Sequence, residues 1–167
     1  MNEAGSRDIS AAAEEQAPRA AVRWLYMIAA LVSLVGLADS IYLTVKHLIG
    51  EKVQCTILSG CDKVLDSPYS SFMGIPLAPL GALAYFSVFS LATLAAFGYK
   101  GTRTLLMLVV GIMLLMTLRL LYVQAFVLHH YCEFCMLSAL VTLTLSGLML
   151  FAYFSPQTHR DEKAYKK

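Results

Sequence analysis

The sequence predicts an all-α membrane protein, a four-transmembrane-helix bundle with a short interfacial helix in the first outer loop. Hydrophobic residues make up 58% of the 167 residues and charged residues 14%, against roughly 45–50% and 25% in typical globular domains. Four apolar stretches have about the 20 residues that a helix needs to cross the hydrocarbon core. None shows the sustained polar face of a soluble core helix. The formal charge of +2 is too small for a nucleic-acid-binding surface.

The predicted organisation is one membrane domain between two tails. The four spans are expected at about residues 24–46, 77–98, 104–128 and 132–154. Residues 1–22 are predicted to form a disordered cytoplasmic tail, residues 23–155 the membrane domain, and residues 156–167 a basic cytoplasmic tail. The first tail is too long and acidic, and the first span too long, for a cleaved signal peptide.

Basic residues predict the orientation of the bundle. Nine of the 13 lysines and arginines lie in the two tails and around the second loop, whereas three lie around the first loop. Cytoplasmic segments carry the excess of such residues, so both termini are expected in the cytoplasm. The first loop and the third turn, which contain all four cysteines, then face outward. In a bacterial inner membrane that side is the periplasm, where disulfides persist.

The first outer loop contains a helix-start signal. Ser67 followed by Pro68 is typical of an N-cap and first helical position, and Gly74 and Pro76 would end that helix. Its apolar side chains predict a short helix on the membrane surface. They are Tyr69, Phe72 and Met73.

The cysteines fall into two pairs with different surroundings. Cys132 and Cys135 form a CxxC motif at the outer start of the fourth span, where the helix dipole favours a thiolate. Their i, i+3 spacing strains a disulfide and makes it more reducible. We expect Cys132 to be the more exposed thiol and Cys135 to lie deeper, within reach of an apolar redox partner. Cys55 and Cys61 lie in the first loop, where a disulfide can open without unfolding the bundle.

Two other interpretations of the cysteines remain open. Both pairs could be structural disulfides that hold the loops of a non-enzymatic membrane subunit, although a membrane bundle is already stabilised by the bilayer and by helix packing. His129 and His130 could join the CxxC thiols around zinc, but the short turn leaves little room for tetrahedral geometry. We therefore expect a redox site without a metal.

Two ionisable residues are predicted within the spans, where a lone charge is costly. Asp39 and Arg119 lie at similar depths, about 6 Å and about 5 Å outward of the centres of spans one and three. We hypothesise an ion pair between them that borders a cofactor cavity. The alternative is that each reaches water separately.

The order of the motifs resembles the bacterial homologues of vitamin K epoxide reductase. The resemblance covers about residues 24 to 154 and rests on the segments GCDKVLDSPY, GIPL, YVQAFVL and CEFC. Membrane oxidases of the DsbB type also have four spans and four cysteines, but their CxxC comes in the first outer loop. Here the CxxC comes second, which favours the vitamin K epoxide reductase family.

The resemblance implies an electron relay that forms disulfide bonds. Cys55 would exchange with a separate periplasmic thioredoxin-like (DsbA-like) oxidase, and Cys61 would pass electrons to Cys132. Cys135 would then reduce a quinone, menaquinone or ubiquinone, and Ser67 matches a serine that supports the loop near the active site. Each transfer between cysteine pairs is the attack of a thiolate on a disulfide.

Departures from the family bear on the substrate and on the partner. The chain ends at Lys167 without the thioredoxin-like domain that many bacterial homologues carry, so we expect a separate partner protein. Ala139 and Ser70 stand where the animal enzyme has a tyrosine and an asparagine that hold vitamin K. Quinone reduction is therefore favoured over reduction of the vitamin K epoxide, which remains an alternative.

Overall fold

The helices and strands of the chain are known from a computed structural model. It describes residues 3–51, 53, 61–65, 67, 70–72, 74–99 and 101–154, with the backbone alone for residues 3–21, 62, 72 and 75. In chain order the elements are α1 (Glu3–Ile49), α2 (Cys61–Leu65), β1 (Ser71–Phe72), β2 (Ile75–Pro76), α3 (Leu77–Ala96), α4 (Thr102–Tyr122), the π-helix η2 (Val123–Leu128) and α5 (Glu133–Phe154). Cys55 lies outside the described residues.

Four helices are long and apolar enough to span a membrane, as predicted. The spans are Val22–Ile49, Leu77–Ala96, Thr102–Leu128 and Glu133–Phe154, and each bound lies within three residues of the prediction. Large apolar side chains on every helix are exposed on the outside of the bundle, among them Leu31, Leu83, Leu115 and Leu140. An apolar outer surface of this extent suits lipid and would be a liability in water.

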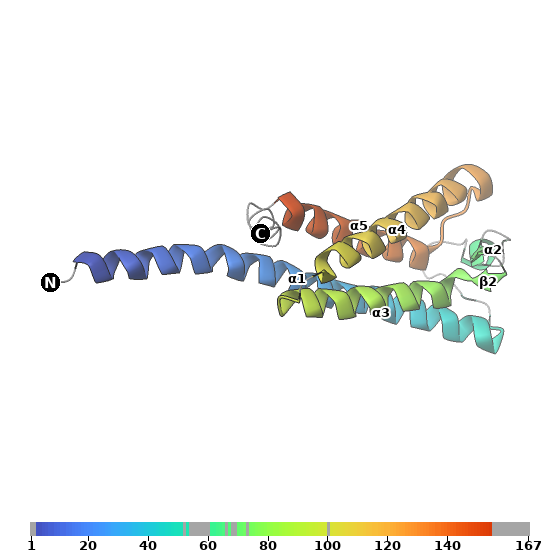
Figure 1. The fold of residues 1–167 in the computed structure, drawn as a ribbon. Coiled ribbons are helices and arrows are strands. Elements are labelled where there is room, and N and C mark those ends of the chain that lie inside the picture. The colour runs from blue at the N-terminus through green and yellow to red at the C-terminus, as the bar shows by residue number, and fades with distance from the viewer. Residues whose placement is uncertain are drawn as a thin grey trace.

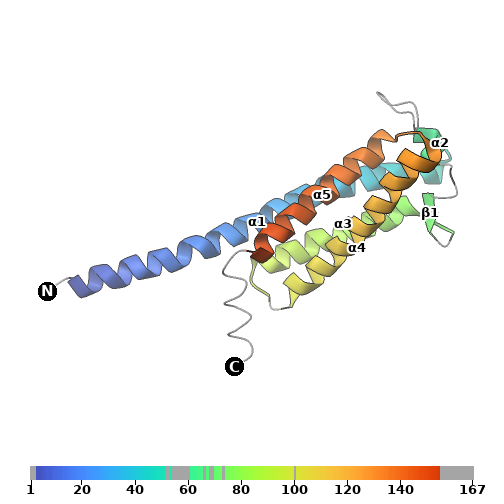
Figure 2. The same ribbon diagram turned by 90° about the horizontal axis from the view of Figure 1, so that it is seen from above.

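The helices form a bundle in which α1 and α4 are diagonal to each other. α1 packs against α3 and α5, and α4 packs against the same two helices (Figures 1 and 2). Small side chains such as Ala29 on α1 and Ala92 on α3 are fully buried in this core, which lets the helices approach closely. The end of the bundle that carries α2, β1, β2 and the turn before α5 is called the cysteine end below.

The first helix begins earlier than predicted. α1 starts at Glu3, where the sequence predicted a disordered tail over residues 1–22, and its N-terminal part extends beyond the bundle (Figure 1). The segment AAAEEQ at residues 11–16 consists of strong helix formers, which favours a helix that continues beyond the span.

The predicted interfacial helix starting at Ser67 is wrong beyond Ser70. The backbone N–H of Ser70 donates to the carbonyl of Ser67 at 3.0 Å, which closes a single turn. β1 then pairs with β2 in an antiparallel hairpin. Gly74 lies between the strands with φ of 83°, a conformation that glycine adopts readily. The short helix of this loop is instead α2, which ends before Ser67.

Candidate functional site

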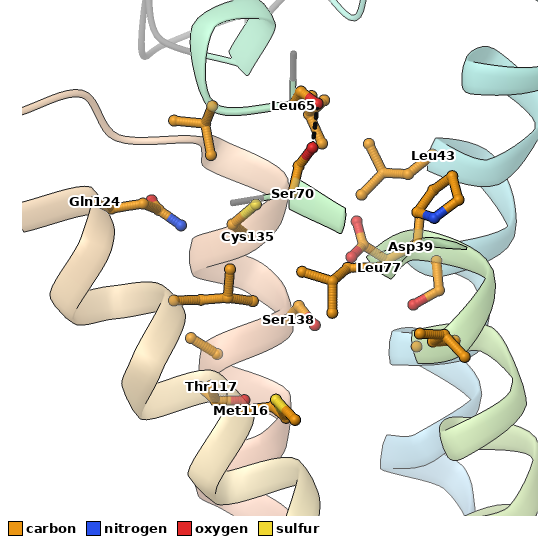
Figure 3. Close-up of a pocket in the computed structure, with 18 of the residues that line it drawn as sticks. Asp39, Leu43, Leu65, Ser70, Leu77, Met116, Thr117, Gln124, Cys135 and Ser138 are labelled. Carbon is orange, nitrogen blue, oxygen red and sulfur yellow. Dashed lines mark hydrogen bonds between the residues drawn. The ribbon is translucent and has the colours of Figure 1, made fainter. Parts of the chain in front are cut away.

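A cavity of about 680 Å³ lies inside the bundle near the cysteine end (Figure 3). All four membrane helices line it, together with η2 and the loop between α1 and α3. Its volume is within the roughly 300–1,000 Å³ of small-molecule sites. Most of the lining is apolar, and it includes Leu43, Leu77, Ile112, Met113, Met116, Leu120, Leu121 and Leu128.

A few polar side chains interrupt this apolar lining. Asp39, Ser70, Thr117, Gln124 and Ser138 line the cavity and come from different parts of the chain (Figure 3). Sites for small organic molecules commonly combine an apolar wall with a few polar groups that fix orientation. The cavity is therefore suited to a flat, largely apolar molecule with a small number of hydrogen-bonding atoms.

Cys135 lines this cavity and Cys132 does not. Both are free thiols. The expectation that Cys132 is the more exposed is wrong, because Cys132 is 0% exposed whereas Cys135 is partly exposed. The helix position of Cys132 suggested access to water, but α2 and Val53 pack in one cluster with it. The deeper thiol, Cys135, is the one that a molecule in the cavity can meet.

Cys132 is held at the N-terminal end of α5. Its carbonyl accepts the N–H of Met136 at 2.9 Å. A hydrogen bond from the thiol of Cys135 lowers the pKa of Cys132, backbone N–H groups of the first helical turn add to this effect, and burial opposes it. A lowered pKa increases the thiolate fraction, and the thiolate is the nucleophile in disulfide exchange.

Cys61 and Cys132 belong to the same buried cluster. Cys61 is disulfide-bonded and 1% exposed, and the cluster also contains Leu43, Val53 and Val64. Thiol–disulfide exchange requires a thiol to reach a disulfide sulfur, and the shared cluster places Cys61 and Cys132 in one buried region. The structure thus brings together three of the four predicted cysteines, and the fourth, Cys55, is not described.

Gln124 was not predicted as a site residue. It is 1% exposed, and its Oε1 accepts the backbone N–H of Cys132 at 3.2 Å. Gln124 lies in η2, and the wider π-helical turn changes which residues face inward; such turns are frequent at functional sites. The available signal was an amide side chain within an otherwise apolar stretch of the third span.

Ser67 and Ser70 stabilise the loop above the cavity. The hydroxyl of Ser67 donates to the carbonyl of Val64 at 2.7 Å, and that of Ser70 donates to Leu65 at 2.6 Å. These bonds satisfy carbonyl groups at the end of α2, which a one-turn helix leaves without partners. Ser67 and Ser70 both line the cavity, as does Ala139.

A hydrogen-bonded group of three side chains forms part of the cavity lining. The hydroxyl of Tyr85 on α3 lies 2.8 Å from the Ser138 hydroxyl and 3.0 Å from that of Thr142, both on α5. Tyr85 is 1% exposed, and its ring lies against Gly36 of α1. Three helices are thereby fixed at one level of the bundle.

The predicted ion pair between Asp39 and Arg119 is wrong. Asp39 is 8% exposed and lines the cavity, whereas Arg119 is exposed on α4. A similar depth along two helices does not bring these side chains together, because α1 and α4 are diagonal in the bundle. Within the described residues, Oδ2 of Asp39 has no hydrogen-bond partner.

The histidines of the turn before α5 do not join the cysteines. His129 is exposed and has φ of 53°, and Nε2 of His130 lies 3.3 Å from Nζ of Lys63. Among the residues that the structure describes, no three histidine, cysteine or acidic side chains form a group that could hold a metal ion.

Comparison with known proteins agrees with this geometry. Residues 27–150 match the model of the vitamin K epoxide reductase family. No curated protein matches the chain. The matched segment includes the cavity, all four cysteines and the whole of the loop between α1 and α3.

Proposed function

The chain belongs to the vitamin K epoxide reductase family, whose members are membrane oxidoreductases. We propose that this protein is a thiol:quinone oxidoreductase that drives disulfide formation. One observation carries the proposal: Cys132 and Cys135 are a free dithiol, and Cys135 lines a cavity between four membrane helices. A dithiol there can give electrons to a molecule that arrives from the bilayer.

A membrane quinone, menaquinone or ubiquinone, fits the chemistry of the cavity. Its ring is flat and apolar, and it has two carbonyl oxygens that accept hydrogen bonds. The volume of about 680 Å³ suits a ring of this size, and the apolar lining suits the attached hydrocarbon chain. Cys135 is the thiol that meets the quinone.

The presence of Cys61 and Cys132 in one buried cluster supports an ordered transfer of electrons. A reduced thioredoxin-like protein would reduce the loop pair at Cys55, and Cys61 would attack the Cys132–Cys135 disulfide. This exchange forms the loop disulfide and leaves the inner pair as thiols. The structure, with Cys61 in a disulfide and the inner thiols free, corresponds to the state that is ready to reduce the quinone.

The proposed location follows from the same order of events. With the cysteine end in the periplasm and both termini in the cytoplasm of a bacterial inner membrane, the loop pair faces oxidisable protein partners. The excess of basic residues at the other end of the bundle supports this orientation. The proposed partner is a separate thioredoxin-like oxidase.

Two features favour quinone reduction over the alternatives. Ser70 and Ala139 line the cavity at the positions that match vitamin K contacts of the animal enzyme, and both are smaller than the residues that they replace. A purely structural role for the cysteines is disfavoured because Cys132 and Cys135 form no cross-link in the described structure.

The test uses the purified protein with a reduced thioredoxin-like oxidase and short-chain quinone analogues. We expect the wild type to reduce the quinone, Cys132→Ser and Cys135→Ser to abolish this while still folding, and Met136→Leu to be active. Met136 is the matched control because it is a sulfur-containing neighbour on the same helix turn that does not line the cavity. A wild type that reduces neither menaquinone nor ubiquinone analogues would refute the proposal.

A further inference from the structure

Asp39 is a buried carboxyl group, and one of its oxygens has no hydrogen-bond partner among the residues that the structure describes. It lies ten residues before the end of α1 at Ile49, about 15 Å along the helix. It is 8% exposed, and Oδ2 has no hydrogen-bond partner within the described part of the chain. A carboxylate in such surroundings is costly unless it is paired or hydrogen-bonded.

Ionisable side chains inside membrane spans commonly serve a ligand or a proton path. Asp39 faces a ligand-sized space, since its carboxyl group points into the cavity from α1 (Figure 3). Cys135 lies on the opposite wall, on α5, and the cavity separates the two side chains. A molecule that fills this space therefore contacts a thiol on one side and a carboxyl group on the other.

A 1,4-quinone matches this arrangement because its two oxygens point in opposite directions from the ring. With one oxygen beside Cys135, the other is directed toward Asp39. Reduction places negative charge on both oxygens, and each must gain a proton. The thiols are suited to supply the near oxygen, whereas the far oxygen needs a donor on the α1 side.

We propose that Asp39 is a catalytic acid that gives a proton to the quinone oxygen opposite Cys135, an inference that rests on the proposed quinone reduction. Two thiols lose two electrons and two protons and become a disulfide, and the quinone gains two of each and becomes a hydroquinone. One thiol proton goes to the near oxygen. The second thiol proton is released to water, and a proton from water replaces the one that Asp39 has given to the far oxygen, so Asp39 ends the cycle unchanged.

The wall of the cavity on α1 extends from Asp39 to water. Asp39, Leu43 and His47 are spaced four residues apart and all line the cavity, so they share one face of the helix. His47 is exposed near the end of α1, about 12 Å from Asp39 along the axis. Water that enters along this face can carry the replacing proton to Asp39.

The decisive variant is Asp39→Asn, which keeps the shape and hydrogen-bonding capacity of the side chain but cannot donate an acidic proton. The assay uses dithiothreitol as reductant and a short-chain 1,4-quinone as acceptor, with the protein-free rate subtracted. We expect kcat to fall about 100-fold, as is typical for loss of a general acid, with KM for the quinone changed less than about threefold. Asp39→Glu, which keeps an acid, should retain at least about a tenth of kcat.

Two controls separate chemistry from structure. Thr44→Val lies about one turn along the same helix, removes only a hydroxyl that donates to the carbonyl of Ser40, and should leave kcat unchanged. The reaction of the pre-reduced thiols with a disulfide reagent, which needs no quinone, should be as fast in Asp39→Asn as in the wild type. If Asp39→Asn does not fold, Asp39→Ser is judged by the same measurements.

Three results would overturn the role of Asp39. They are a kcat of Asp39→Asn close to that of the wild type, an equal loss in Asp39→Asn and Asp39→Glu, and an effect confined to KM. Each of these requires an active wild type. A wild type without quinone reduction refutes the proposed function itself, so the two failures are distinguishable.

Discussion

Gly36 is the position at which one added methyl group tests the packing of α1 against α3. A Cβ atom built there would lie 2.5 Å from Cε1 and 2.6 Å from Cζ of Tyr85. These distances are far below van der Waals contact, and the obstructing atoms belong to a buried ring rather than to a flexible end. Gly36→Ala therefore forces Tyr85 or α1 to move.

The cost of that movement can be worked from the contacts. Overpacking a filled core costs about 1–3 kcal/mol. Displacing the Tyr85 hydroxyl from Ser138 and Thr142 weakens two hydrogen bonds, each of about 0.5–1.5 kcal/mol net. The better helix propensity of alanine returns about 1 kcal/mol. The expected net loss is about 2 kcal/mol, or about 30-fold in the unfolding equilibrium.

The assay is unfolding in mixed micelles of a mild detergent and SDS, followed by circular dichroism. Gly147→Ala on α5 is the matched control, because an added Cβ there meets nothing within 4 Å among the described residues, and it should be neutral or slightly stabilising. In the background of Tyr85→Ala the penalty at Gly36 should disappear. Equal stability of Gly36→Ala and Gly147→Ala would refute the close packing of Gly36 on Tyr85.

Three further predictions concern the site. Gln124→Leu removes the acceptor of the Cys132 N–H and should slow quinone reduction about tenfold, with a stability loss of about 1–3 kcal/mol. Gln124→Glu keeps the acceptor and should retain more activity. Equal rates of the two variants would contradict a role of Gln124 in positioning Cys132. Cys135→Ala removes the hydrogen bond that lowers the pKa of Cys132, so the pKa of Cys132 should rise. The titration is followed by the ultraviolet absorbance of the thiolate, and an unchanged midpoint would count against that bond. Arg119→Gln should change stability by less than about 0.5 kcal/mol and leave quinone reduction unchanged, because Arg119 is exposed and does not pair with Asp39. A large loss of stability in unfolding experiments would instead support the ion pair.

The spans could be predicted from the sequence because crossing a bilayer imposes a length on each apolar run. Apolar runs such as LLMLVVGIMLLMTL in α4 fix that helix whatever its neighbours are. The cavity between the spans could not be predicted, since it depends on how far the helices approach one another. Gln124 shows this limit, because its inward direction depends on the π-helical turn.

Three predictions that depended on neighbours in space failed. Depth along a helix is proportional to residue number, so Asp39 and Arg119 could be placed at one level, but their separation is set by the diagonal arrangement of α1 and α4. The start of α5 predicted an exposed Cys132, yet burial of that thiol comes from α2, which is distant in sequence. The signal at Ser67 and Pro68 is local, and the pairing of β1 with β2 overrides it beyond Ser70.

Complete burial of Cys132 has a kinetic consequence for the proposed relay. A small thiol in solution, such as glutathione, exchanges with a disulfide only by direct contact with a sulfur atom, and Cys132 offers no surface for this contact. Electrons can reach the sulfur of Cys132 from Cys61, which belongs to the same buried cluster. Burial thereby protects Cys132 from direct exchange with thiols of the surrounding solution, and a small thiol has to approach the inner pair at Cys135, through the cavity.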